Sequence, residues 1–228
     1  MADTPTSAPD MHMGPSWMTH PLVRLGAIAV VLSLAYVQWL PFPWRMPIVG
    51  ALGVTWVLVE TRRWRAAGFG RQSLWATLGW TAALVILVAG IIGPVLEPLV
   101  DRLTGTPVDY SGYGALRGNV PMARDLVLGA WLSAALGEEL VFRAFLVHQL
   151  AALFRATPVR GALATLVGGV VFGLMHADQG LAGIVLTGLV GALFCAAYLR
   201  SGRNLWALVL AHGLIDTWGV FTLYQGWV

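Results

Sequence analysis

The feature that most limits how this chain can fold is its series of long apolar segments. A helix of about 20 residues crosses a bilayer core of about 30 Å. Hydrophobic residues make up 57% of the chain and charged residues 11%, so the folded chain cannot expose its surface to water. The sequence therefore predicts an all-α fold, a polytopic transmembrane helix bundle. The expected segments are residues 22–40, 46–60, 74–100, 122–154, 160–177, 180–199 and 204–224.

Segment 122–154 leaves the number of spans open at seven or eight. At 1.5 Å per residue it extends about 50 Å, so it must tilt, break or continue along the interface. A break near Gly137 gives eight spans and brings Glu138 and His176 to similar depth. A single span gives seven and keeps four arginines in the cytoplasm, as the positive-inside rule prefers. These are Arg155, Arg160, Arg200 and Arg203.

The first part of the chain predicts the membrane topology and contains no candidate catalytic residue. Residues 1–21 are predicted to be a disordered tail, and residues 22–119 to hold the N-terminal spans and one long loop. Four arginines between residues 62 and 71 favour a cytoplasmic loop there, which places the N-terminus inside. Loop 101–119 then lies outside, and its glycines favour a plain connector over a lid. The net charge of +3 indicates no nucleic-acid partner.

Three charges interrupt the apolar segment 122–154. Glu138, Glu139 and Arg143 lie within six residues, and a charge at the centre of a bilayer costs at least about 2.5 to 3.5 kcal/mol. Glu139 and Arg143 are four residues apart, so they can neutralise each other on one helix face. Glu138 lies about 100° round the axis and remains free to titrate, which makes it a candidate general base.

Other polar residues within the apolar segments are His176, Asp178, His212 and Asp216. His212 and Asp216 share a helix face because they are four residues apart. Each residue alone could simply hydrogen-bond a neighbouring helix. Together with Glu138, however, two imidazoles and a further carboxyl are the groups needed to activate water on an amide.

The order of these residues resembles that of a known family. Glu138-Glu139-x-x-x-Arg143, Phe172-x-x-x-His176 and His212-x-x-x-Asp216 resemble the three motifs of the CPBP family of CAAX proteases and bacteriocin-processing enzymes. The resemblance implies a catalytic core over residues 120–224 and an intramembrane endopeptidase. It implies that Glu138 and His176 activate water and that His212 and Asp216 flank the oxyanion.

The resemblance also implies supporting residues. Glu139 with Arg143 would form a structural ion pair, and Phe172 would pack beneath His176. Asp216 stands where CAAX-processing members carry Asn, and a carboxylate there favours orienting His212 over donating to the oxyanion. No cofactor is expected, although Glu138, His176 and His212 are an alternative zinc ligand set.

The expected partners are the lipid bilayer and a membrane-embedded protein or peptide substrate. The expected location is a cell membrane, with the bacterial inner membrane as the specific prediction. A non-catalytic role in bacteriocin self-immunity or as a scaffold is the alternative function, and a transporter is a further one.

Overall fold

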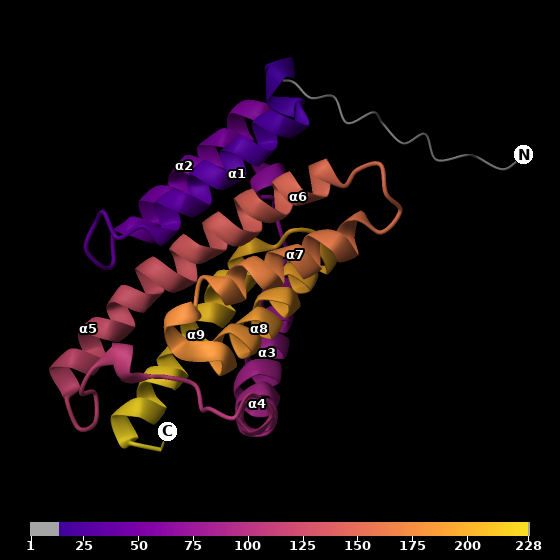
Figure 1. Cartoon of the computed structure of the whole chain (residues 1–228). Helices are drawn as coiled ribbons and strands as arrows, with labels where there is room; N and C mark the ends of the chain where they lie inside the picture. Colours follow the sequence, from indigo (N-terminus) through magenta and orange to yellow (C-terminus); the bar gives the residue numbers. More distant parts are fainter. Residues whose placement is uncertain (1–13, 228) are drawn as a thin grey trace, which may run out of the picture.

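The computed structural model describes residues 14–227, and its regular elements there are all helices (Figure 1). Three of them are long and apolar enough to cross a membrane, namely Leu74–Thr104, Ala177–Arg200 and Leu205–Gln225. Two shorter apolar helices, Pro21–Tyr36 and Arg160–Leu174, accompany them. The predicted all-α fold of a helical membrane bundle is confirmed.

The described residues form 7 helical rods, several of which join α-helical, 3₁₀ (η) or π (η) stretches end to end. The fourth rod runs without a break through Gly137, so the arrangement with a break there does not occur. Its middle part, η5, is a π-helix flanked by α5 and α6. The rods are α1 (Pro21–Tyr36), α2 (Arg45–Thr61), α3–η3–α4 (Leu74–Leu87, Val88–Leu96, Glu97–Thr104), α5–η5–α6 (Val120–Ala130, Trp131–Val147, His148–Leu153), α7 (Arg160–Leu174), η6–α8 (Ala177–Gln179, Gly180–Arg200) and α9 (Leu205–Gln225).

Two glycines allow helices to approach closely around the polar residues. A Cβ on Gly137 would lie 2.7 Å from the backbone of Met46 and Pro47. Only glycine at this position, directly before Glu138, therefore lets α2 pass so close to η5. A Cβ on Gly169 of α7 would lie 2.7 Å from the Cβ of Ala192 on α8. Small residues at such crossings are typical of helices packed within membranes.

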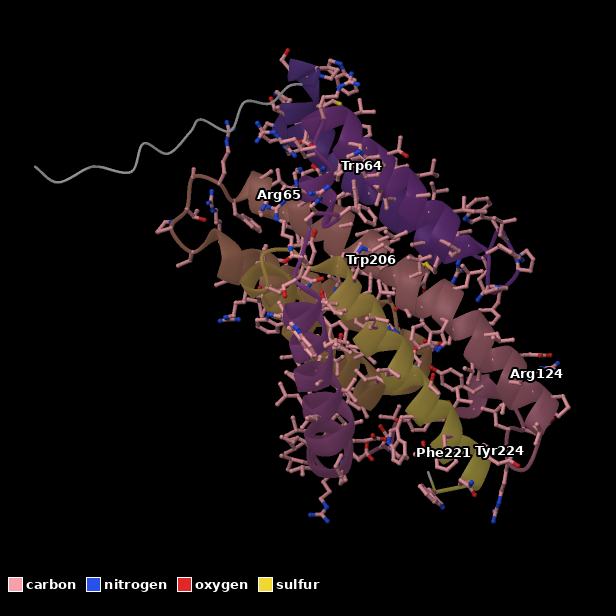
Figure 2. All side chains as sticks on the ribbon, turned by 180° about the vertical axis from the view of Figure 1, so that it is seen from behind. Trp64, Arg65, Arg124, Trp206, Phe221 and Tyr224 are labelled. Carbon is pink, nitrogen blue, oxygen red and sulfur yellow. The ribbon has the colours of Figure 1, made fainter. Side chains whose placement is uncertain are left out.

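The arginine-rich loops gather at one end of the bundle. Arg203 donates to the carbonyl of Ala66 at 3.0 Å, and Gln72 donates to the carbonyl of Gly202 at 3.2 Å. Figure 2 shows Trp64 and Arg65 toward this end, and Arg124, Phe221 and Tyr224 toward the opposite end. The loop between α4 and α5 lies at the opposite end, where the amide of Gly118 donates to the carbonyl of Tyr224 at 3.0 Å.

The last part of the segment expected to be a tail is helical in the structure. Residues Ser16–Thr19 form the 3₁₀ turn η1, and Met18 within it is buried. The ring of Trp17 lies 6.0 Å from that of Trp56 on α2. Burial of Met18, together with a hydrogen bond from the amide of Gly14 to the carbonyl of Glu60 on α2 at 3.1 Å, holds a stretch that was assigned to the tail. Residues 1–13 of the predicted tail lie outside the described residues.

Candidate active site

The π-helix η5 buries an ion pair at the centre of the bundle. Arg143 Nη1 donates to Glu139 Oε1 at 2.8 Å, and the two side chains are 1% and 0% exposed. The guanidinium also lies 4.8 Å from the ring centroid of Phe172 and 5.0 Å from that of Phe194. The expected ion pair is therefore present, and two aromatic faces add cation–π attraction to it.

His212 of α9 is held by the same glutamate. Its Nδ1 lies 2.8 Å from Glu139 Oε1, and because a carboxylate only accepts, the imidazole donates its Nδ1–H. Its other nitrogen, Nε2, lies 3.7 Å from Asp216 Oδ2 and 4.0 Å from Glu138 Oε2. The hydrogen bond at Nδ1 thus fixes the orientation of the ring, and Nε2 faces the carboxylates of Asp216 and Glu138.

This geometry changes the role expected for Asp216. The contact that orients His212 comes from Glu139, whereas Asp216 faces the nitrogen on the reactive side. Sequence spacing indicated the Glu139–Arg143 pair within one helix but could not show that Glu139 also reaches α9. The ion pair and the orientation of His212 therefore depend on one carboxylate oxygen.

His176 lies where α7 ends, at the turn before η6. Its Nδ1 lies 2.8 Å from the backbone carbonyl of Phe172, so this nitrogen carries the hydrogen and leaves Nε2 unoccupied by that contact. The ring of Phe172 lies 4.7 Å from that of His176 and 6.4 Å from that of His212, centroid to centroid. Phe172 therefore packs between the two histidines, and not only against His176.

The structure brings most of the predicted residues into one cluster. Glu138, Glu139, His212 and Asp216 meet within 4.0 Å through His212. Side chains of Glu138 and Asp216 are 18% and 25% exposed, while Glu139 is fully buried, so solvent-sized molecules can reach the first two. Asp178 is exposed beyond His176.

Within residues 14–227, no group of three His, Cys, Asp or Glu side chains is arranged to hold a metal ion. The zinc set of Glu138, His176 and His212 is not such a group in this geometry. Whether the reaction needs a metal stays a prediction, which a chelator can test.

Two sets of hydrogen-bonded polar residues were not predicted from the sequence. Arg24 pairs with Glu60 and donates to Gln149 at 2.6 Å, while Gln149 donates to Glu60 at 2.9 Å. All three are buried. A charge inside segments 22–40 and 46–60 was the signal that could have revealed Arg24 and Glu60, whereas Gln149 carries no charge. The second set is Tyr113 with Gln179, where Gln179 donates to the phenol oxygen at 3.1 Å. No pattern in the sequence indicates that contact.

Comparison with known proteins finds a family match over one part of the chain. Residues 123–218 match a family model described as type II CAAX prenyl endopeptidase Rce1-like. This range contains all three motifs and agrees with the resemblance drawn from them. No curated protein and no solved structure matches the chain.

Proposed function

Residues 123–218 belong to the type II CAAX prenyl endopeptidase Rce1-like family, and on this premise we propose that Glu138 activates water to cleave a peptide bond. One observation carries the proposal. An oxygen of Glu138 lies 4.0 Å, and an oxygen of Asp216 3.7 Å, from Nε2 of His212 inside a bundle of apolar helices. Ionisable groups gathered in membrane segments mark functional sites, because their insertion is costly.

Glu138 is the base because its carboxylate is the least engaged of the cluster. Glu139 is committed to Arg143 and to His212, whereas Glu138 is partly exposed and makes its nearest charged contact at 4.0 Å. It takes a proton from water, and the resulting hydroxide adds to the carbonyl carbon of the substrate. His176, held through Nδ1, uses Nε2 to position the same water.

His212 stabilises the intermediate. With Nδ1 bonded to Glu139, its Nε2 donates to the oxyanion when that nitrogen carries a proton, and Asp216 supplies a negative charge beside it. Collapse of the intermediate breaks the C–N bond. The proton held on Glu138 passes to the leaving amine, so the products are an acid and an amine and the base is restored.

We propose a membrane-associated protein or peptide as the substrate class, because the site lies among helices that meet lipid. The proposed reaction uses the protein's own carboxylate as base. We therefore expect cleavage to persist after treatment with a chelator such as 1,10-phenanthroline. Loss of cleavage that returns on adding zinc would replace this mechanism with a metal-assisted one.

The test compares peptide termini of the membrane proteome in cells carrying the native protein or Glu138→Gln at equal abundance. Asp125→Asn is the matched control, because it makes the same carboxyl-to-amide change at an exposed position on the same helical rod. We expect new termini with the native protein and with Asp125→Asn but not with Glu138→Gln. The same termini in all three strains would reject Glu138 as base, and no new termini in any strain would favour the immunity or scaffold role.

A further inference from the structure

The loop between α4 and α5 is attached to the turn that carries His176. The amide of Asp109 donates to the carbonyl of Gln179 at 3.0 Å, and the side chain of Gln179 donates to the phenol oxygen of Tyr113 at 3.1 Å. Gln179 in turn donates its backbone N–H to the carbonyl of His176 at 3.0 Å. This loop was interpreted as a connector, yet it places a tyrosine beside the candidate active site.

The charges of the candidate active site act on Tyr113. Burial, together with the negative charges of Asp216, Glu138 and Asp178, raises the pKa of Tyr113 to about 12. The phenol therefore keeps its proton at any physiological pH. It is a neutral donor in a site whose other side chains are mainly acids and imidazoles.

The phenol O–H of Tyr113 can also donate a hydrogen bond to a substrate. Because Gln179 donates to the oxygen, this contact uses a lone pair and leaves the O–H free, and within residues 14–227 the phenol donates no hydrogen bond. Tyr110, three residues earlier, differs in this respect. Its hydroxyl donates to Glu97 at 2.7 Å and is therefore committed to the loop.

We propose that Tyr113 is a further residue of the endopeptidase site and donates its phenol O–H to the carbonyl oxygen of the scissile peptide bond. The inference rests on the function proposed above. An ionised Asp216 cannot donate to a developing oxyanion, so His212 alone would face it. A second, neutral donor fixed by Gln179 completes a pair, and two preorganised donors are what an oxyanion requires.

The experiment removes only the hydroxyl. Tyr113→Phe and the matched control Tyr110→Phe are compared with the native protein and Glu138→Gln, first by the termini produced in cells. The precursor of the most abundant terminus that depends on Glu138 is then placed with each purified protein in vesicles of phosphatidylethanolamine and phosphatidylglycerol, and kcat and KM are measured separately.

We expect Tyr113→Phe to lower kcat by about 100-fold with KM changed less than about threefold, as for loss of one oxyanion donor. Tyr110→Phe should stay within about twofold of native in both constants. In an Asp216→Asn background, which supplies an amide donor, Tyr113→Phe should lower kcat by less than about tenfold. This dependence on residue 216 distinguishes a donor from a residue that only supports the loop.

Two results would overturn the inference while the proposed function stands. One is a Tyr113→Phe protein with native kcat alongside an inactive Glu138→Gln protein. The other is an equal loss of kcat in both tyrosine variants, which would assign the effect to the loop. If the native and Glu138→Gln proteins do not differ, the proposed function fails and the role of Tyr113 fails with it.

Discussion

Replacing Arg143 with alanine should strongly destabilise the protein, because it breaks a buried ion pair. The guanidinium is 1% exposed and lies 2.8 Å from a carboxylate that is fully buried. Without it, the hydrogen bond to His212 is the one that Glu139 keeps among residues 14–227. Leaving one partner of a buried pair uncompensated costs about 3 to 5 kcal/mol.

The expected shift in melting temperature follows from this free energy. For chains of 150 to 250 residues, each kcal/mol lowers Tm by about 2 to 4 °C, so Arg143→Ala should lower Tm by about 6 to 20 °C. The assay is thermal unfolding of the purified protein in detergent micelles, followed by circular dichroism. Steady-state abundance in membranes should fall in parallel.

Arg124→Ala is the control, because it also removes an arginine from an ion pair. Arg124 lies 2.7 Å from Asp125, but the side chains are 67% and 66% exposed, and such surface pairs contribute about 0 to 1 kcal/mol. Combining Arg143→Ala with Glu139→Gln should cost less than the sum of the two single changes, since it removes the stranded charge. Equal melting temperatures for Arg143→Ala and Arg124→Ala would refute the reasoning.

Two further predictions concern packing and orientation. Gly169→Ala should lower both Tm and cleavage, because its Cβ would lie 2.7 Å from that of Ala192 and would push α7 away from α8. The control Gly79→Ala should be neutral, because its Cβ meets no atom within 4 Å. Equal effects in the two variants would contradict the close crossing of α7 and α8. In a Cys195→Ala background, a membrane-impermeant maleimide should label Ser111→Cys in intact cells but Arg63→Cys only after permeabilisation, and the reverse pattern would invert the predicted topology.

The sequence was sufficient for the helices because their signal is local. The predicted segments 46–60 and 204–224 correspond to α2 at Arg45–Thr61 and α9 at Leu205–Gln225. Length and apolarity determine such bounds, since every backbone polar group within a bilayer must be satisfied inside its own helix. The Glu139–Arg143 pair was predictable for the same reason, as it depends only on spacing along one helix.

Contacts between helices were not predictable in the same way. Glu139 reaches His212, 73 residues later, and Gln179 reaches Tyr113, 66 residues earlier. Neither pair has a spacing that one helix could reveal, and each depends on how the rods are placed against one another. Asp216 was therefore expected to orient His212, although Glu139 makes that contact.

A comparison of the two buried polar clusters explains why function is proposed for one of them. In the cluster of Arg24, Glu60 and Gln149, each oxygen of Glu60 accepts a hydrogen bond, one from Arg24 and one from Gln149. A carboxylate satisfied in this way holds helices together and has no capacity to react. Glu138 instead remains partly exposed, with His212 Nε2 4.0 Å away. Buried charge alone is therefore compatible with a purely structural role. A carboxylate without a close hydrogen-bond partner, beside an imidazole held in one orientation, indicates a catalytic role.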